Sequence, residues 1–336
     1  MDVMVFRGFC SRIGELSVAE LRVLRAALEE LDARVEARGR IDARGERLGR
    51  CLHCGAEGPR PWGQTRTGLK RFRCAACRRT FSSATGTVVA RLRLVDKFAA
   101  AVADMLSGAT PASCRALAAR LGVGRMTAWR WRMRTLEALE RIGAPALYGI
   151  VEADETFVRE SRKGSREWVR HLKNPENFPE PDRPRWREPH EPGDGPARRV
   201  DPRSWQVPVL TLADRAEARR VDRLPDREGM RIVERLARHV GHDAVLCSDR
   251  AEAYRTFAQL RGQPHVRINA SNGPRVIDGA FHIQTVNNLH GRLGRFLAPF
   301  CGPATRHLQR YLDWFLARIE QTSDRTEATW HRILAA

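Results

Sequence analysis

Apolar residues recur at helical spacing through the first 48 residues of the chain. Leu24, Leu28, Leu31 and Val35 lie three or four positions apart, with Glu and Arg between them. Such spacing places apolar side chains along one side of a helix. Residues 1–48 are therefore predicted to form a helical segment, which either docks on the part of the chain that follows or mediates self-association.

Three further helices are predicted at 96–107, 110–121 and 125–139, the last two separated by Gly122-Val123-Gly124. In the third helix we expect an inner stripe at Met126, Trp129, Met133 and Leu136. Polar residues flank this stripe, with Arg125 and Arg132 on one side and Thr127, Arg130 and Arg134 on the other. Two helices joined by a glycine-containing turn, with a basic second helix, are typical of a helix-turn-helix that reads the major groove. The alternative is an ordinary helical hairpin with a solvated arginine face.

From about residue 148 the pattern changes to the alternation of strands. Residues 151–157, 204–213, 244–249 and 265–268 are predicted as strands, and 226–240, 251–261 and a long segment from about 284 as helices. Pro208 predicts an edge or a bulge in the second strand, because proline cannot donate to the ladder. This order predicts a mixed sheet with flanking helices. A polar insertion at 159–204, with eight of the eighteen prolines, interrupts the sheet after its first strand.

Two aspartates of this predicted sheet are candidates for metal binding. Asp154 lies inside the first strand between Glu152 and Glu155, and Asp249 ends the strand at 244–249. Aspartate is depleted in strands, and a buried charge must be paired or bound to metal. Ligands in sheet-based α/β proteins lie at the carboxyl ends of strands. Both residues are therefore predicted to hold a divalent cation. A solvated acidic strand end is the alternative.

The charge of the chain favours a polyanionic partner. The net charge is +19, and residues 50–141 carry 18 basic and 5 acidic side chains. Arginine in such excess over lysine can partly reflect a GC-rich genome, so its placement is more informative than its total. This concentration indicates a module that binds nucleic acid.

The eight cysteines include two pairs with the spacing of a zinc site. Cys51 and Cys54 are followed, after nineteen residues, by Cys74 and Cys77. Two such pairs present four thiolates to a tetrahedral zinc ion, and a redox dithiol would need only one pair. The chain shows no signal-peptide pattern and no apolar run of membrane-spanning length. We therefore expect a cytoplasmic protein with reduced thiols and a structural zinc.

The ordered motifs of the chain resemble one family. They are the paired cysteines with Arg71-Phe72-Arg73-Cys74, then Thr127-Ala128-Trp129-Arg130-Trp131-Arg132, Glu152-Ala153-Asp154-Glu155-Thr156, Ser161-Arg162-Lys163-Gly164-Ser165-Arg166, Val207-Pro208-Val209-Leu210, Leu246-Cys247-Ser248-Asp249 with Tyr254, the stretch from His282 to Leu293, and Tyr311 to Phe315. Together they resemble bacterial insertion-sequence transposases of family fifteen-ninety-five.

The resemblance implies a multidomain α+β protein. Its parts would be a helical segment at 1–48, a zinc ribbon at 49–85, a helix-turn-helix at 95–141 and an RNase H-like catalytic domain of DDE type at 148–320. It also implies Mg²⁺- or Mn²⁺-dependent cleavage at the element's ends and strand transfer into target DNA. The protein would be nucleoid-associated and a homo-oligomer on double-stranded DNA.

Within this resemblance, Asp154, Asp249 and Asn287 would hold the two catalytic cations. We assign His290, three residues after Asn287, an auxiliary role at the scissile phosphate or as a proton shuttle, the alternative being a histidine packed on the sheet. Two carboxylates that share two ions can activate the attacking oxygen and stabilise the leaving one. The chain departs from the family at Gly294, where a lysine is usual.

Other assignments remain open from the sequence. Lys163 and Arg166 at the start of the insertion are candidates for phosphate contacts, and a solvated linker is the alternative there. A catalytically inactive, sequence-specific DNA-binding regulator and a different RNase H-like nuclease are alternatives for the whole chain. Two strand-positioned aspartates argue against the regulator, and the DNA-binding array argues against the other nuclease.

Overall fold

The computed structural model describes residues 3–106, 110–142, 146–181, 206–269 and 273–319, with 329 and 333. The chain divides into two compact units, residues 1–138 with 322–336, and residues 139–321. Each unit is described by itself. Within the described residues, no helix is both long and apolar enough to cross a membrane.

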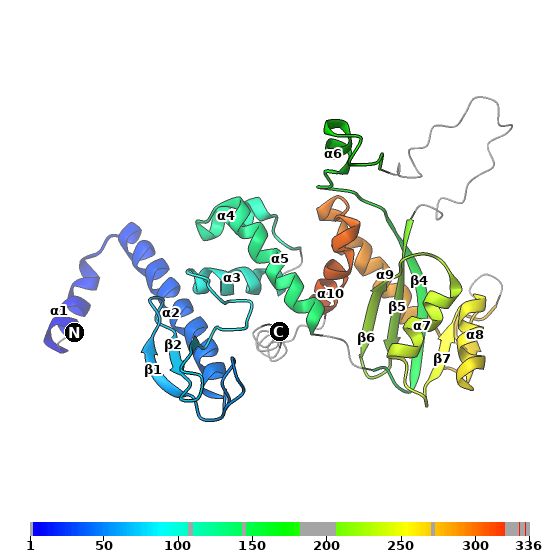
Figure 1. Ribbon diagram of the computed structural model, residues 1–336, viewed down its shortest axis with the longest axis horizontal. Coiled ribbons are helices and arrows are strands. Elements are labelled where there is room, and N and C mark those ends of the chain that lie inside the picture. Colours follow the sequence, from blue (N-terminus) through cyan, green and yellow to red (C-terminus); the bar gives the residue numbers. More distant parts are fainter. Residues whose placement is uncertain are drawn as a thin grey trace. The chain divides into compact units, whose positions relative to one another are not determined.

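The first unit combines helices with a small three-stranded sheet (Figure 1). Its elements are α1 (Val3–Arg12), η1 (Ile13–Glu15), α2 (Val18–Glu46), β1 (Arg60–Gln64), β2 (Lys70–Arg73), β3 (Thr80–Ser82), α3 (Val95–Leu106), α4 (Cys114–Leu121) and α5 (Arg125–Arg141), whose last turn belongs to the second unit. The helices predicted at 1–48 and in the region 95–141 are thus confirmed, with shifts at their ends.

Helix α2 has two halves with different surroundings. Its first turn is closed by a capping box, in which the Ser17 side chain accepts from the Glu20 amide and the Glu20 carboxylate accepts from the Ser17 amide. Its last turns pack on the small sheet, where Ile41 is fully buried and Asp42 Oδ1 accepts from the Lys70 amide at 2.9 Å. Docking of this segment on the part that follows is therefore confirmed for its carboxyl-terminal half.

The second unit is built on a five-stranded mixed sheet in the order β6-β5-β4-β7-β8. Its elements are β4 (Ile150–Arg159), α6 (Glu167–Lys173), β5 (Gln206–Asp214), β6 (Arg219–Arg223), α7 (Gly229–His239), β7 (Val245–Ser248), α8 (Glu252–Arg261), β8 (His265–Arg267), α9 (Gln284–Leu297), η4 (Ala298–Phe300), η5 (Thr305–His307) and α10 (Leu308–Ile319). The sheet is antiparallel from β6 to β4 and parallel from β4 to β8. The mixed sheet with flanking helices predicted from the sequence is confirmed.

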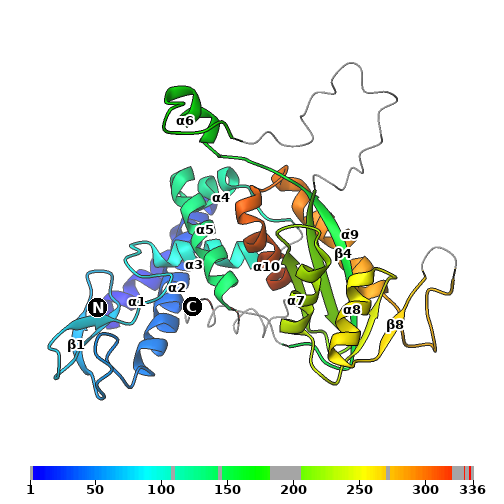
Figure 2. The ribbon, with the colours of Figure 1, turned by 45° about the vertical axis from the view of Figure 1, so that its right-hand side comes forward.

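Helices cover both faces of this sheet (Figures 1 and 2). Apolar side chains of α7 and α8, such as Leu236 and Phe257, form one core with Val151 and Leu212 of the sheet. Helices α9 and α10 lie on the other side, where α9 contacts β4 and β5 and α10 contacts β6. Strand β4 is therefore central in the sheet and covered on both faces, a position from which its side chains reach either layer.

Two expectations for this unit are wrong in detail. Strand β5 lies between β4 and β6, so Pro208 marks neither an edge nor a bulge. Pro208 is accommodated because it lies where the β6 ladder ends, and its carbonyl accepts from the Leu224 amide at 3.0 Å. The insertion also begins with a short helix, α6, which the proline content did not predict, and residues 182–205 lie outside the described residues.

Candidate catalytic site and nucleic-acid interface

The two predicted aspartates lie beside each other on neighbouring strands. Strands β4 and β7 are parallel, and Ala153 pairs with Ser248, so Asp154 comes next on β4 and Asp249 comes directly after the last residue of β7. Asp154 Oδ1 accepts from the Glu155 amide and Asp249 Oδ1 accepts from the Ala251 amide, both at 2.9 Å. These hydrogen bonds hold the two carboxylates at the end of β7.

The electrostatics of this pair favour a bound cation. Burial, and after it the negative charge of Asp249, raises the pKa of Asp154 to about 6. Two ionised carboxylates that lie side by side repel each other unless a positive charge neutralises them. Oxygen ligands with net negative charge are those that Mg²⁺ prefers. The donor set therefore fits a divalent cation of this kind, although the two aspartates alone supply fewer ligands than such an ion needs.

Glu155 points to the opposite face of β4 from Asp154, toward α8. The hydroxyl of Tyr254, which is fully buried, donates to Glu155 Oε1 at 2.8 Å. Burial raises the pKa of Glu155 to about 7, although the tyrosine hydrogen bond opposes the shift. Glu155 is thus a second carboxyl group of this region with a raised pKa.

Helix α9 brings His290 to the aspartates. The His290 Nδ1 atom lies 3.9 Å from Asp154 Oδ2, and its Nε2 atom is buried without a hydrogen-bond partner. Burial lowers the pKa of His290 to about 4, so its imidazole is neutral at physiological pH. Asn287, one turn earlier on the helix, has an exposed side chain. Of the two candidates on α9, His290 is the one that contacts Asp154.

Glu152 joins the strand that carries Asp154 to the helix that carries His290. Its carboxylate accepts from the amides of Thr285 and Val286 at 2.8 and 3.2 Å, and from the Thr285 hydroxyl at 2.7 Å. It also forms an ion pair with Arg215, and His282 Nδ1 lies 3.2 Å away. The carboxylate is 1% exposed. Sequence reasoning treated Glu152 only as a neighbour of Asp154 and missed this role.

A sequence signal for the role of Glu152 did exist. The first turn of α9 follows Ile283, which cannot cap a helix with its side chain. The free amides of that turn therefore need an external acceptor, and a carboxylate is favoured by the helix dipole. Glu152 lies two residues before Asp154, on the same face of β4, and can supply that acceptor.

The four paired cysteines come together in the first unit. Their sulfur atoms all lie within 4.8 Å of one another, with Cys51 and Cys77 at 3.7 Å and Cys54 and Cys74 at 3.7 Å. Sulfurs about 2.3 Å from a tetrahedral zinc ion are about 3.8 Å apart, so the cluster has the size of a zinc site. Although burial opposes it, amide hydrogen bonds from His53 and Cys54 lower the pKa of Cys51 to about 6. Among the described residues, this is the one place where three or more His, Cys, Asp or Glu side chains could hold a metal together.

Helix α5 presents a different side to solvent from the predicted one. Ala128, Trp131 and Leu136 are buried, whereas Met126 and Trp129 are 59% and 46% exposed. The predicted inner stripe is therefore wrong for its first two members. Ala128 and Trp131 instead face the core of this unit, where Trp131 packs edge-on against Phe98 with ring centroids 6.0 Å apart.

The five predicted DNA-contacting residues of α5 also have different surroundings. Arg125 and Arg130 are exposed, and Thr127 and Arg134 are half-buried. Arg132 is 4% exposed and donates to the Ala112 carbonyl, so its predicted contact with DNA does not fit the structure. The Arg132 guanidinium is buried because it supports the segment before α4, to which Ala112 belongs.

One family model matches the chain, over residues 184–319. The matched stretch includes Asp249, Asn287 and His290, and begins after Asp154. The chain contains an ISXO2-like transposase domain. This match supports the family predicted from the sequence. No match to the chain was found among curated proteins.

The transposase domain carries a group of arginines on and near α9. Burial, together with the charges of Arg219 and Arg295, lowers the pKa of Arg292. The Arg292 guanidinium is therefore close enough to those of Arg219 and Arg295 to be repelled by both, and an anionic phosphate would relieve this repulsion. Gly294, between Arg292 and Arg295, is exposed, and a side chain added there would meet no atom within 4 Å.

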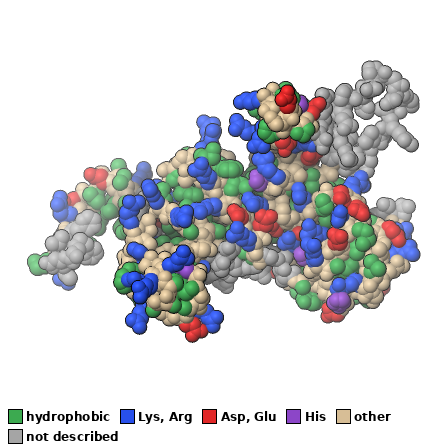
Figure 3. Space-filling model, in the orientation of Figure 1, with side chains coloured by type: hydrophobic (Ala, Val, Ile, Leu, Met, Phe, Trp, Pro, Cys, Tyr) green, Lys and Arg blue, Asp and Glu red, His purple; other side chains and the backbone are tan. Residues whose placement is uncertain are grey.

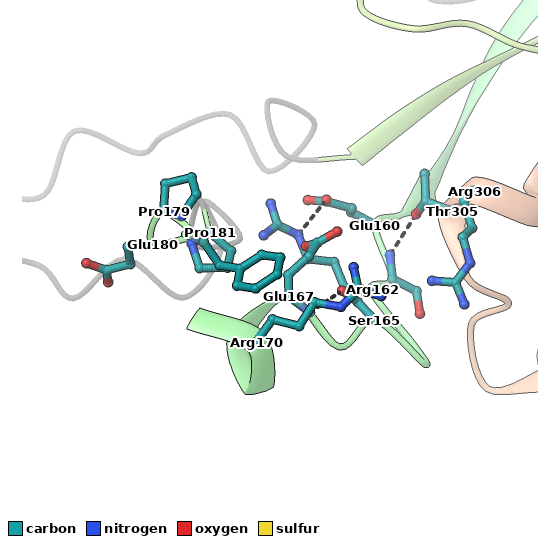
Figure 4. Close-up of a pocket in the computed structure, with 12 residues that line it drawn as sticks. Glu160, Arg162, Ser165, Glu167, Arg170, Pro179, Glu180, Pro181, Thr305 and Arg306 are labelled. Carbon is teal, nitrogen blue, oxygen red and sulfur yellow. Dashed lines mark hydrogen bonds and ion pairs between the residues drawn. The ribbon is translucent and has the colours of Figure 1, made fainter. Parts of the chain in front are cut away.

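The start of the insertion lies against the segment between α9 and α10 of the transposase domain (Figure 4). Ser161 and Thr305 exchange hydrogen bonds at 2.8 Å, and a cleft of about 630 Å³ lies beside them, lined by Arg162, Arg170 and Arg306 among others. Lys163 donates to the carbonyls of Phe300 and Cys301 at 3.1 and 3.4 Å. Of the two predicted phosphate contacts, Lys163 is thus engaged with the backbone, and Arg166 is exposed.

Proposed function

We propose that the protein is a DNA transposase that binds the ends of its insertion element and catalyses divalent-metal-dependent strand cleavage and strand transfer. The observation that carries this proposal is the pair Asp154 and Asp249 on adjacent parallel strands, with a raised pKa at Asp154, in a chain with a transposase domain. A sequence-specific regulator without catalytic activity would gain nothing from two mutually repelling carboxylates at this place.

The topology of the second unit supports an RNase H-like reading of this domain. Three antiparallel strands are followed by two parallel ones, and the carboxylates lie on the central strand and on its parallel neighbour. Helix α9 packs across the face to which Asp154 points. This arrangement leaves the carboxylates, His290 and the arginines of α9 on one side of the sheet, where a DNA backbone can reach them together.

We assign roles to the site residues from their chemistry. Asp154 and Asp249 would hold Mg²⁺ or Mn²⁺, with the Asn287 carbonyl oxygen as a further ligand; such ions lower the pKa of a bound water or hydroxyl and offset charge on the leaving oxygen. His290 is neutral, and its Nδ1, 3.9 Å from Asp154 Oδ2, is placed for an auxiliary role at the scissile phosphate or in proton transfer. Arg292 and Arg295 would bind phosphate oxygens of the DNA strand.

The first unit would bring the chain to DNA. Residues 50–141 carry a net charge of +13, and Lys and Arg side chains are numerous over α4, α5 and the small sheet on the face drawn in Figure 3. We infer a zinc ribbon at the four cysteines and a helix-turn-helix in α4 and α5, joined by a turn in which Gly122 has φ +59°. The electrostatic attraction between these basic side chains and DNA is strongly salt-dependent, because binding releases counterions from the phosphates.

We also propose that the protein acts as a homo-oligomer on DNA. Ahead of its docked last turns, α2 exposes Val23, Leu28, Leu31 and Val35, each by more than half. A stripe of this kind on a long helix favours pairing with another helix. Two element ends must meet for strand transfer, and two chains could each hold one end.

The proposed function is tested with DNA from the flanks of the gene, which should carry short inverted repeats. Full-length zinc-loaded protein is incubated with duplexes that carry this DNA, in Mg²⁺ or in EDTA. We expect Mg²⁺-dependent cuts at the repeat ends and joined products with target plasmid. Binding to the repeats without any cleavage in Mg²⁺ or Mn²⁺ would favour the regulator instead.

The roles assigned to Asn287 and His290 on α9 have their own test. Asn287→Ala is expected to lower turnover far more than His290→Ala, since a ligand is lost in the first case and a proton acceptor in the second. The matched control is Asn288→Ala, because Asn288 is exposed on the same helix and has no assigned role. A larger loss from His290→Ala than from Asn287→Ala would reverse the assignment and make the imidazole the ligand.

A further inference from the structure

The outward side of α5 combines apolar and basic side chains. Met126 is 59% exposed, Trp129 is 46% exposed, and Arg130 beside them is also exposed. At about 100° per residue, these three positions fall within about 100° of the helix circumference. They therefore form one contiguous face of the helix, which we call the outer face.

The apolar members of the outer face have no part in the core of the unit. The opposite side of the helix, through Ala128, Trp131 and Leu136, makes the buried contacts. An exposed indole and thioether that lie side by side on one helix face, next to basic residues, offer an apolar surface to a ligand. The folded unit leaves these two side chains available for a ligand.

The charge of the same stretch favours a duplex over a protein. Four arginines precede the first acidic residue of α5, which is Glu137, and the helix starts directly after the turn Gly122–Gly124. A helix placed in this way enters the major groove with its first turns, and its Arg125 and Arg130 lie where phosphates or guanine edges are expected. The outer face would then meet base edges.

We propose that Met126 and Trp129 form an apolar reading site for the C5-methyl groups of thymines in the major groove of duplex DNA. This inference rests on the DNA-binding part of the proposed function and adds which bases are read and by which side chains. The thymine methyl is the one apolar group that the four base pairs present in the major groove, and apolar side chains are its natural contacts. Phosphate contacts from the arginines would position the helix but would not distinguish sequences.

The test uses duplexes that the full-length, zinc-loaded protein selects from a random-sequence library. Each thymine of the selected site is replaced in turn by deoxyuridine, which removes the methyl group and keeps every hydrogen-bonding atom. Loss of one buried methyl group is expected to weaken binding about fourfold, from about 0.8 kcal/mol per buried carbon. We expect this loss at one to three thymines of the site.

The variants Met126→Ala and Trp129→Ala identify the side chains that read these methyl groups. Each should weaken binding to the thymine duplex and become insensitive to deoxyuridine at the thymine that it contacts. The slope of log affinity against log salt should stay unchanged, whereas Arg130→Ala should reduce that slope by about 1 if Arg130 contacts a phosphate. Met230→Ala is the matched control, because Met230 is 47% exposed on α7 and has no assigned role.

Equal thermal midpoints and zinc content show that the variants are folded, and Trp129→Phe provides a milder change. If the folded variants bind as wild type and keep full sensitivity to deoxyuridine, the inference is wrong. It is also wrong if they lose self-association and keep DNA affinity, because the outer face would then bind protein. If wild type binds no duplex in low salt, the DNA-binding part of the proposed function fails first.

Discussion

Replacement of Glu152 tests how the catalytic helix is held against the catalytic strand. The Glu152 carboxylate, 1% exposed, binds two amides and a hydroxyl in the first turn of α9 and pairs with Arg215. Removing the carboxylate leaves two amides and a hydroxyl of α9 without their acceptor, at about 1–3 kcal/mol for each buried polar group, whereas Arg215, 35% exposed, remains solvated. We therefore expect Glu152→Ala to lower the free energy of unfolding by about 3–5 kcal/mol. Glu152→Gln, which keeps the shape and loses the charge, should cost about 1–2 kcal/mol.

The effect on activity follows from the same contacts. The contacts of Glu152 with the first turn of α9 anchor this helix on β4. When this anchor is lost, α9 is free to shift along β4, and His290 moves away from Asp154. Strand cleavage by Glu152→Gln should therefore fall at a temperature where the variant is still folded, while duplex binding by the first unit is retained. The assays are urea unfolding and single-turnover cleavage.

Glu234→Ala is the matched control for the anchor. Glu234 lies on α7, and its carboxylate is 53% exposed and 3.6 Å from Arg231. An exposed pair of this kind contributes about 0–1 kcal/mol. If Glu152→Ala is no more destabilising than Glu234→Ala, or if Glu152→Gln cleaves as wild type, the anchoring role is refuted.

Three further predictions concern the metals and the DNA. Purified protein should hold about one zinc per chain, and Cys74→Ser should lose it; full zinc content in this variant would contradict the four-cysteine site. Without divalent metal, stability should fall as the pH rises from about 4 to 7, because the pKa values of Asp154 and Glu155 are raised to about 6 and about 7 and folding therefore favours their protonated forms. Mg²⁺ should accordingly raise the thermal midpoint more at pH 8 than at pH 5, and an equal gain would argue against a cation at Asp154. Gly294→Lys should tighten binding of element ends, since the added side chain meets open space; unchanged binding would mean that Arg292 or Arg295 already provides this contact.

The parts of the fold that follow from local pattern could be predicted from the sequence. A hydrophobic period that fits only one kind of element predicts the strands β4, β7 and β8 and the helices α7 to α9. The spacing of the paired cysteines likewise predicts a single kind of site. The adjacency of Asp154 and Asp249 follows from the parallel pairing of β4 with β7, which a mixed sheet with helical crossovers makes natural.

The buried side of α5 could not be read in the same way. This helix has apolar residues on two sides, Met126 and Trp129 on one and Ala128 and Trp131 on the other. Periodicity alone favours the stripe with the larger side chains, whereas the structure buries the side that fits against Phe98 and encloses Arg132. Side chains left exposed for a ligand resemble core residues in a sequence.

The role of Glu152 depends on contacts between distant segments. Its partners Arg215 and Thr285 are 63 and 133 residues away along the chain. No local pattern links them, and the three acids at 152, 154 and 155 look alike in the sequence. Only the sheet and the position of α9 distinguish the carboxylate that binds α9 (Glu152), the candidate metal ligand (Asp154) and the carboxyl group that accepts from Tyr254 (Glu155).

The central claim is that Asp154 and Asp249 carry out metal-dependent strand cleavage. It is tested most directly by single-turnover cleavage of duplexes with the gene's own flanking DNA, in Mg²⁺, by wild type, Asp154→Ala and Asp249→Ala. The account predicts that both variants bind these duplexes with nearly unchanged affinity and yield no detectable cleavage product. Cleavage by either variant at a rate close to that of wild type would contradict it.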